Sequence, residues 1–489
     1  MRASAVVARP IREAGAVPCA GNVRQFLPWL VAVSLFMENL DATIVNTAVP
    51  SMSAALHVAP LSLKGVLTSY TLSLAVFIPI SGWMADRFGT KRVFATAITV
   101  FSLGSLACGL AINVPMLVAS RVLQGIGGAM MTPVGRIALV RSFPRSELMT
   151  VMQFVVIPAL IGPLLGPVTG GLIVHWLPWR TIFLLNLPFG LIGLWMVRCY
   201  MPDFRDPAAP PLDRAGFLLF GGGIGVLSYV LEVFGEHGLS AVPIILLTLL
   251  GVVLLAAYGW HAHRITTPML RLTLLRIRTF RVSVFGGFIT RLGFGGMPFL
   301  LPLLYQLGMG FPAWKAGLLT MPQALAAMGM KVIGRKILAR LGHRTVLIAN
   351  TIAVGVAISS FTFIGPNTSV WCILPISFVM GFLSSLQFTS MNTLVYADVD
   401  DREASQAGSI ASTAQQMSLS FGVALSALIV AWFLGGMDQT VAADTIPALH
   451  KAFLTMGSLT VISSLVFWTL SSTDGNNVSN RVVRVVQAR

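Results

Sequence analysis

The stretch DRFGTKRV at residues 86–93 recurs with the same spacing as ARLGHRTV at residues 339–346. The flanking stretches VLTSY and AGLLTMP agree with the same offset of about 250 residues to within a residue or two. Two unrelated basic loops could resemble each other by chance, but here the glycine, basic and apolar positions all agree. A duplication of this length predicts a chain built from two similar halves.

The apolar runs around these loops are long enough to cross a bilayer, which takes about 20 residues. The chain is 55% hydrophobic and only 10% charged, whereas about a quarter of the residues in a soluble domain are charged. The sequence therefore predicts an all-α integral membrane protein with fourteen spans. We place them near residues 27–50, 62–85, 93–112, 114–139, 149–174, 179–200, 215–233, 240–262, 280–303, 313–333, 345–364, 369–395, 404–433 and 449–471.

The repeat divides these spans into six, two and six. The second copy of the repeated loop follows the second span of its half, as the first copy does, so the seventh and eighth spans are an insertion. The predicted units are a tail at 1–26, a six-helix bundle at 27–200, two inserted helices with linkers at 201–279, a second six-helix bundle at 280–471, and a tail at 472–489.

Basic residues set the predicted orientation. Arg and Lys gather in alternate loops, such as 87–92 and 335–344, and such loops face the cytoplasm. The loop ADVDDRE at 397–403 is acidic although this topology places it in the cytoplasm, but acidic residues have little weight in this rule. We expect both termini to be cytoplasmic and the protein to lie in a bacterial inner membrane. The net charge of +16 then reflects the basic cytoplasmic loops. The sequence has no basic face with interleaved aromatic residues, so we do not expect nucleic-acid binding.

Several motifs stand in order along the first half. GWMADRFGTKR (82–92) has the spacing G-x3-D-R-x-G-x-[KR]-[KR], RVLQGIGGAMMTPVGR (121–136) sets an arginine ahead of three glycines, and PALIGPLLGPVTGG (158–171) repeats Gly-Pro. LDATIVNTAVP (40–50) and LPWRTIFLLNLPFG (177–190) flank them. The residues singled out in the first and third motifs are Gly82, Asp86, Arg87, Gly89, Lys91, Arg92, Gly162, Pro163, Gly166, Pro167, Gly170 and Gly171.

Together these motifs resemble those of the major facilitator superfamily, and more narrowly the fourteen-span drug:proton antiporters of the EmrB/QacA type. The resemblance covers nearly the whole chain. It implies the major facilitator fold and a monomer that exports amphipathic drugs or related small molecules in exchange for protons, by alternating access and without a cofactor. A dedicated exporter of a metabolite, such as an amino acid or a siderophore, is the alternative of the same fold.

Other classes of function lack their signatures. The chain has no phosphate-binding loop, no HExxH pair and no soluble domain that could hold a Ser-His-Asp set, so we do not expect an enzyme. No loop is long enough for the signalling domain of a membrane sensor. The four cysteines are scattered without a CxxC pair, so no metal site is expected.

The third motif favours close helix packing, because small residues let helix backbones approach where lipid supplies no hydrophobic drive. Its prolines also bend the helix by removing backbone hydrogen bonds. The resemblance implies that this motif marks exporters. For the first motif we predict a latch in which Asp86 lies against the N-terminus of a neighbouring helix, whose partial positive charge favours a carboxylate. The resemblance implies that this contact holds the outward-facing state. The second half has Ala339 at the matching position.

Two acids, Glu38 and Asp41, interrupt the first apolar run. A carboxylate at mid-membrane costs about 3 kcal/mol, so each is expected to have a partner or a function. Counted from Pro50 at 1.5 Å per residue, Asp41 lies about 13 Å below the outer surface. Counted from Asn113, Arg121 of the fourth span lies about 12 Å below it. We therefore predict that Asp41 and Arg121 meet.

Glu38 is expected to share a helix face with Asp41, three residues away. Two carboxylates so close cannot both ionise cheaply, so one is predicted to hold a proton. The resemblance implies Asp41 and Arg121 for proton coupling, whereas an acid at position 38 is not part of the usual pattern. The alternative is that both acids are neutralised structural residues. Through the repeat, Arg291 corresponds to positions 38–40 of the first half. The two halves would then hold opposite charges at equivalent depths, which suggests that Glu38 pairs with Arg291 across the halves.

Overall fold

The computed structural model describes residues 23–233, 241–400, 403–435, 437, 439 and 442–479. Within this part of the chain every regular element is a helix, and fourteen helical segments are long and apolar enough to span a membrane. The predicted fold class and the count of fourteen spans are confirmed. Most of the predicted N-terminal tail, the last ten residues of the C-terminal tail, and Cys19 lie outside the described residues.

The first six spans run from residue 23 to residue 200, and the first and second of them contain short 3₁₀ segments. Their elements are α1 (Val23–Ile44), η1 (Val45–Ala48), α2 (Val49–Leu56), η2 (Pro60–Leu63), α3 (Lys64–Phe88), α4 (Thr90–Gly109), α5 (Val114–Ser142), α6 (Arg145–Trp176), α7 (Thr181–Leu184) and α8 (Asn186–Tyr200).

The inserted pair and the last six spans follow. The pair is α9 (Arg214–Val233) and α10 (Ala241–Arg264), and η3 (Leu272–Arg276) leads into the second half. The second half consists of α11 (Arg278–Phe294), α12 (Met297–Leu303), η4 (Leu304–Gly308), α13 (Ala313–Leu341), α14 (His343–Ser360), η5 (Phe361–Phe363), α15 (Val370–Leu394), α16 (Ala404–Leu434), α17 (Ala442–Ser463), η6 (Ser464–Thr469) and α18 (Asn476–Ser479).

The repeated loop has the same geometry in both halves. Gly89 and Gly342 both have positive φ, at 96° and 79°, a region in which side chains with a Cβ are strained. Each glycine ends one helix by donating its N–H to the carbonyl four residues back, Ala85 at 3.0 Å and Leu338 at 2.9 Å. The next helix starts immediately afterwards in both copies. The sequence repeat is therefore a structural repeat.

The helices pack in the same pattern in the two halves. In the first half α1 packs against α6 and α3 against α5, and in the second half α11 packs against α16 and α13 against α15. The contacts between the halves are reciprocal, because α6 packs against α13 and α3 against α16. This is the packing expected of two bundles related by a pseudo-two-fold axis. The residue boundaries of the predicted units remain a prediction.

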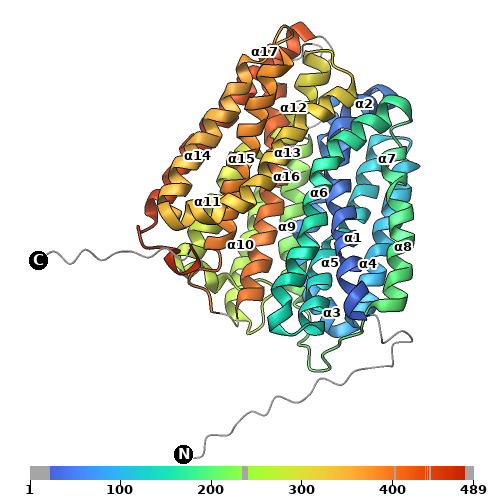
Figure 1. Ribbon diagram of the computed structural model, residues 1–489, viewed down its shortest axis with the longest axis vertical. Coiled ribbons are helices and arrows are strands. Elements are labelled where there is room, and N and C mark those ends of the chain that lie inside the picture. The colour runs from blue at the N-terminus through green and yellow to red at the C-terminus, as the bar shows by residue number, and fades with distance from the viewer. Residues whose placement is uncertain are drawn as a thin grey trace, which may run out of the picture.

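Hydrogen bonds that join the halves lie toward one end of the molecule. Gln306 Nε2 donates to the carbonyl of Thr47 at 3.0 Å, and Ser420 Oγ donates to the carbonyl of Thr68 at 3.1 Å. Thr47 lies in η1, between α1 and α2, and Thr68 lies in the first turns of α3. Figure 1 shows α2 near the upper end of the molecule. The halves are therefore closed at the end opposite the repeated basic loops.

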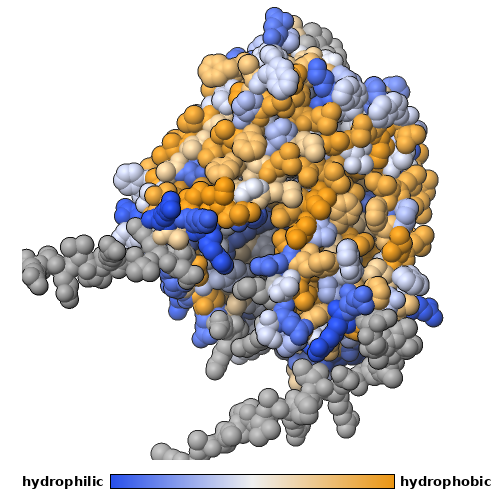
Figure 2. Space-filling model, in the orientation of Figure 1, coloured by the Kyte–Doolittle hydropathy of each residue, from blue (hydrophilic) through white to orange (hydrophobic). Residues whose placement is uncertain are grey.

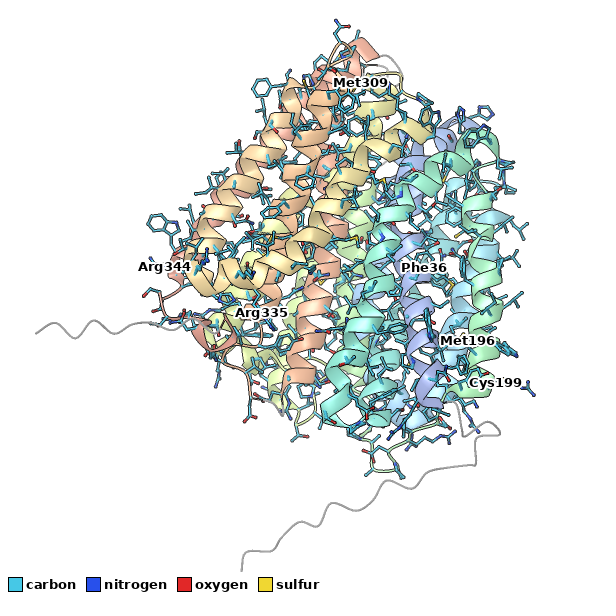
Figure 3. The ribbon with its side chains drawn as sticks, in the orientation of Figure 1. Phe36, Met196, Cys199, Met309, Arg335 and Arg344 are labelled. Atoms are coloured by element: carbon cyan, nitrogen blue, oxygen red, sulfur yellow. The ribbon has the colours of Figure 1, made fainter. Side chains whose placement is uncertain are left out.

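The surface and the position of labelled residues agree with a membrane-spanning molecule. Figure 2 shows a broad hydrophobic belt across the middle of the visible face, with hydrophilic side chains above and below it and around a hollow in its lower half. In Figure 3, Met309 lies at the upper end of the second half, whereas Arg335 and Arg344 lie toward its lower end. Only 11% of the most apolar 18-residue stretch of the inserted helix α10 is buried, as expected for a helix that faces lipid.

Candidate functional site

Asp41 and Arg121 form an ion pair in the core of the first half, as predicted. Arg121 Nη1 lies 2.6 Å from Asp41 Oδ2, and the two side chains are 1% and 0% exposed. The guanidinium also donates from Nε to the carbonyl of Val66 at 3.1 Å and stacks over the ring of Tyr70 at 4.2 Å. The helices that contribute are α1, α3 and α5, so one pair of charges ties three spans together.

Three polar residues that sequence reasoning missed complete this network. Gln124 Nε2 and Asn186 Nδ2 both donate to Asp41 Oδ1, at 2.8 Å and 2.6 Å. Ser105 Oγ accepts from the same two amides at 3.2 Å and 2.9 Å. Gln124 lies one turn after Arg121 on α5, which was a usable signal, whereas Asn186 lies 145 residues from Asp41 and gave none.

The network surrounds Asp41 with hydrogen-bond donors. All of the hydrogen bonds that Asp41 makes are accepted from donors, which is the role of a carboxylate rather than a carboxylic acid. The side chain has no exposed surface. Solvent therefore reaches Asp41 only if the network opens.

Glu38 lies in a different environment, one turn before Asp41 on α1. Its Oε2 accepts from Thr132 Oγ1 of α5 at 2.7 Å, and the side chain is partly exposed. Arg136, one turn beyond Thr132, is the cation that acts on it electrostatically. Arg121 is the counterion of Asp41, so the two acids of α1 are held by different partners on α5.

The structure does not bring Glu38 and Arg291 together. Arg291 on α11 is 3% exposed, donates from Nη2 to Asn392 Oδ1 at 3.3 Å and lies 4.7 Å from the centre of the Phe388 ring. Glu38 contacts α5 and Arg291 contacts α15, and these two helices are the fourth membrane spans of their own halves. The repeat put the two residues at equivalent positions, and equivalent positions face equivalent neighbours instead of each other.

Asp86 contacts a side chain in its own half and not a helix N-terminus. Its Oδ1 lies 2.7 Å from Arg141 Nη2, near the last turn of α5, with both side chains about one-third exposed. Its carbonyl accepts from the N–H of Asp206 at 3.0 Å. The predicted latch is thus not formed in this conformation, in which Asp86 pairs with Arg141.

The other residues of the first motif hold the turn or remain exposed. Lys91 Nζ donates to the carbonyl of Arg198 at 2.9 Å, which ties the start of α4 to the end of α8. Arg87 and Arg92 are exposed. A Cβ at Gly82 would meet nothing within 4 Å, so this glycine is not required by packing in the state described.

The Gly-Pro motif on α6 makes the close packing that the sequence predicted. A Cβ at Gly162 would lie 2.9 Å from the backbone nitrogen of Leu40, and one at Gly170 would overlap the carbonyl oxygen of Ile44. The glycine between them, Gly166, meets the side chain of Thr43. Helix α1, which carries both acids, therefore lies directly against the glycine face of α6.

The end of the same motif contacts the second half. A Cβ at Gly171 would overlap the carbonyl oxygen of Ala313, at the start of α13. On α13, Gly317 lies equally close to the carbonyl of Pro167, and Thr47 Oγ1 donates to that carbonyl at 3.2 Å. Helix α6 thus has one small-residue contact within its own half and one across the interface.

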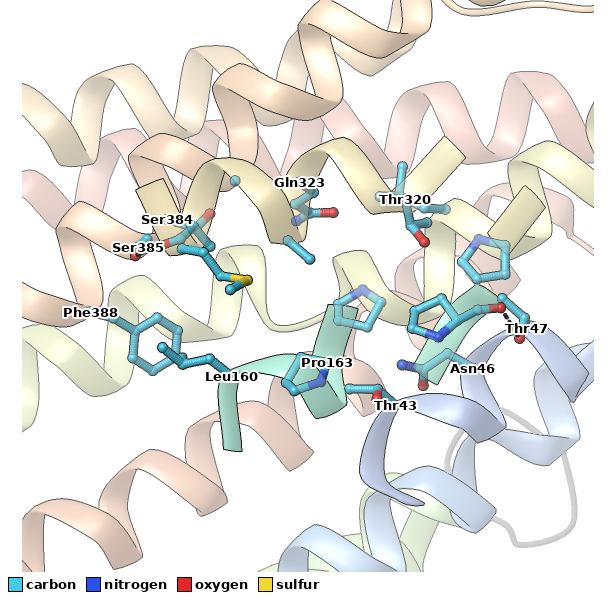
Figure 4. Close-up of a pocket in the computed structure, with 18 of the residues that line it drawn as sticks. Thr43, Asn46, Thr47, Leu160, Pro163, Thr320, Gln323, Ser384, Ser385 and Phe388 are labelled. Atoms are coloured by element: carbon cyan, nitrogen blue, oxygen red, sulfur yellow. Dashed lines mark hydrogen bonds between the residues drawn. The ribbon is translucent and has the colours of Figure 1, made fainter. Parts of the chain in front are cut away.

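A cavity of about 450 Å³ lies between the two halves. Figure 4 shows side chains of α1 and α6 on one side of it, among them Thr43 and Pro163, and those of α13 and α15 on the other, among them Gln323 and Phe388. Its wall is mainly apolar, with a few polar groups, which is the usual character of a small-molecule site. Within the described chain no group of three His, Cys, Asp or Glu side chains could hold a metal ion.

Comparisons with known sequences agree with this architecture. A family model described as Major Facilitator Superfamily matches residues 31–423. The putative multidrug resistance protein MdtD of Serratia proteamaculans is 41% identical over 430 residues, which cover 88% of this chain and 89% of that protein. A protein of the same name from Escherichia coli is 39% identical over 454 residues, covering 92% of this chain and 96% of that protein.

Solved structures show the same fold at low sequence identity. A bacterial homolog of the human lysosomal transporter Spinster, in an inward-facing and unoccupied conformation, has a TM-score of 0.67 at 14% identity and covers 96% of this chain and 100% of that one. A D-xylose–proton symporter has a TM-score of 0.63 at 13% identity, with 92% and 98% covered. At such identities the likeness concerns the fold alone.

Proposed function

Because this chain belongs to the major facilitator superfamily, we propose that it exports amphipathic small molecules, including drugs, in exchange for protons. It is a multi-pass membrane transporter and not an enzyme. Relatives that cover most of its length are named putative multidrug resistance proteins, which supports drugs as one class of substrate. We also propose that it works as a monomer in the bacterial inner membrane with both termini in the cytoplasm.

The observation that carries the proposal is the position of Glu38. It is an acid within a membrane span, it is partly exposed, and its carboxylate accepts a hydrogen bond from Thr132. Five residues further along α1, Thr43 lines the cavity between the halves. A proton on Glu38 and a substrate in the cavity therefore act on the same helix, which is the minimum that coupling requires.

The two acids of α1 then have different roles. Glu38 exchanges the proton, and the sealed pair of Asp41 and Arg121 holds α1 in register with α3, α5 and α8. In the proposed topology the end at which the halves are closed faces outward, so Glu38 would release its proton to the cytoplasm in this state. Substrate would enter from the same side. Reprotonation from outside would follow once the halves rock to the opposite state.

Transport in everted membrane vesicles tests the proposal. Vesicles that contain the protein are acidified inside by respiration and challenged with a panel of fluorescent amphiphiles that carry positive, neutral and negative head groups. We expect at least one probe to accumulate and to lower ΔpH as it does so, with both effects abolished by a protonophore. Failure of every probe to accumulate above vesicles that lack the protein would contradict the proposal, as would accumulation that a protonophore leaves unchanged.

A dedicated metabolite exporter is the second candidate, and one observation favours it. Polar side chains on α13 and α15, among them Gln323, Lys331 and Asn392, line one wall of the cavity. A site built only for apolar drugs would not need these hydrogen-bonding groups. The vesicle assay would favour this candidate if a single chemical class of probe accumulated.

A further inference from the structure

One positive charge lines the wall of the cavity formed by the second half, a second lies behind that wall, and no acidic side chain lines it. Lys331 on α13 lines the cavity and is the sole charged residue among the described residues that line it. Arg291 lies behind the same wall, where Asn392 and Phe388 separate it from the cavity. No ion pair is formed by either residue within the described chain, whereas the buried arginine of the first half has Asp41.

The two cations converge on one turn of α15. Lys331 Nζ lies 3.4 Å from Thr389 Oγ1, and Arg291 donates to Asn392 and stacks on Phe388. Phe388 and Asn392 lie four residues apart, on one face of the helix. A negative group bound beside residues 388–392 would therefore interact with Lys331 directly and with Arg291 across a single layer of side chains.

The neutral groups on the same wall also favour an anion. Because Asn392 Oδ1 accepts from Arg291, the amide nitrogen of Asn392 is left for the cavity. Ser384, two turns earlier on the same face of α15, has a buried hydroxyl with no partner. On α13, Gln323 and Lys331 line the cavity two turns apart, and the exposed Arg335 follows Lys331 by one turn. Apart from side-chain oxygens that can also accept, the wall offers N–H and O–H donors.

We infer that the substrate of this cavity is an amphipathic organic anion, with a carboxylate bound at Lys331 and Asn392 and an apolar body against the prolines of α6 and α12. The inference rests on the proposed function, because it takes this cavity as the transport site. A carboxylate would supply the charge that the second half lacks and would accept from the unpartnered donors. A cationic amphiphile would instead bring a third positive charge to a wall without acids.

Binding to purified protein in detergent tests the head group separately from transport. The probes are dansylglycine, dansylglycinamide and dansyl-ethylenediamine, which share one apolar body and carry a negative, a neutral and a positive end. Dansyl fluorescence reports the Kd of each. We expect dansylglycine to bind roughly tenfold or more tightly than the amide, which corresponds to one charge-assisted hydrogen bond. We expect the amine to bind most weakly.

Variants assign the preference to the wall. Lys331→Met should remove most of the difference between dansylglycine and its amide, and Lys331→Glu should reverse the order of the acid and the amine. Lys336→Met, an exposed lysine on α13 that does not line the cavity, is the matched control and should leave all three Kd values unchanged. Arg291→Gln, if it folds, should raise the Kd of dansylglycine. If it does not fold, the Lys331 variants alone test the inference.

The outcomes separate the inference from the proposed function. Equal affinities for dansylglycine and its amide, tightest binding of the amine, or equal effects of Lys331→Met and Lys336→Met would overturn the inference. Displacement of dansylglycine by phosphatidylglycerol and not by other soluble carboxylates would also overturn it, because a lipid headgroup would then be the ligand. A carboxylate preference in binding together with transport that ignores protons would refute only the coupling proposal.

Discussion

At the scale of single residues, the number of hydrogen-bond donors decides what each acid of α1 can do. Asp41 accepts from three side chains and is sealed from solvent, whereas Glu38 accepts from one and is partly exposed. The sequence predicted that Asp41 and Arg121 would meet, because their depths could be counted along the helices. It did not predict Asn186, because no spacing rule links residues so far apart in the chain.

Neutralising Glu38 should uncouple transport without removing the site. We expect Glu38→Gln to bind the dansyl probes with unchanged Kd, since residue 38 does not line the cavity, and to lose proton-driven accumulation in everted vesicles. Glu38→Asp, which keeps the titratable group, should retain part of the activity. Full proton-driven accumulation by Glu38→Gln would show that another group carries the proton.

Removing one partner of the sealed pair should be costly, because it leaves a charge buried without its counterion. We expect Asp41→Asn to destabilise the protein by about 3 kcal/mol or more, with a partial recovery in the double variant Asp41→Asn/Arg121→Gln. Asp86→Asn breaks an ion pair that is about one-third exposed, and should cost no more than about 1 kcal/mol. Thermal unfolding in detergent measures all three, and equal losses from Asp41→Asn and Asp86→Asn would contradict the assignment.

At the scale of elements, the glycines of α6 decide how closely α1 can pack. The motif predicted close packing, and the structure shows the partner to be the backbone of α1 from Leu40 to Ile44. The sequence could not give that partner, because small residues indicate a close approach without indicating which helix approaches. The 3₁₀ segment η1, which follows α1, was also not predicted, since the first span reads as one continuous apolar run.

Adding one methyl group on the glycine face of α6 should therefore lower the stability of the protein. We expect Gly170→Ala to destabilise the protein by about 1–3 kcal/mol, because the new Cβ would overlap the Ile44 carbonyl, a backbone atom that cannot rotate away. Gly329→Ala on α13 is the control, since a Cβ there meets nothing within 4 Å. Thermal unfolding and expression level in the membrane are the measurements, and a Gly170→Ala protein as stable as Gly329→Ala would show that α6 can shift.

At the scale of the whole molecule, the repeat predicted the architecture but not the distribution of charge. The reciprocal contacts of α6 with α13 and of α3 with α16 follow from the duplication. The pairing of Glu38 with Arg291 did not follow, because symmetry-equivalent residues face their own bundles. The two halves differ in how they hold a buried arginine, because Arg121 is paired with Asp41 whereas Arg291 donates to the neutral Asn392.

The latch predicted for Asp86 would act on the equilibrium between the two conformations of the transporter. If Asp86 stabilises the outward-facing state, Asp86→Ala should shift the population toward the state described here, in which the halves are closed at the end opposite the repeated basic loops. The cavity residue Asn392, replaced by cysteine, should then react faster with a membrane-impermeant maleimide in everted vesicles. Native Cys372, exposed near the other end of α15, is the reference in cells. Unchanged labelling of Asn392→Cys would exclude the latch.

The most direct test of the account is proton exchange by purified protein in liposomes. With dansylglycine outside and an acid interior, and with the membrane potential clamped by potassium and valinomycin, we predict uptake of the probe coupled to alkalinisation of the interior. Both signals should vanish in Glu38→Gln and persist in Lys336→Met. Uptake without alkalinisation in the wild-type protein, or equal proton movement in Glu38→Gln, would contradict the claim that Glu38 couples protons to export.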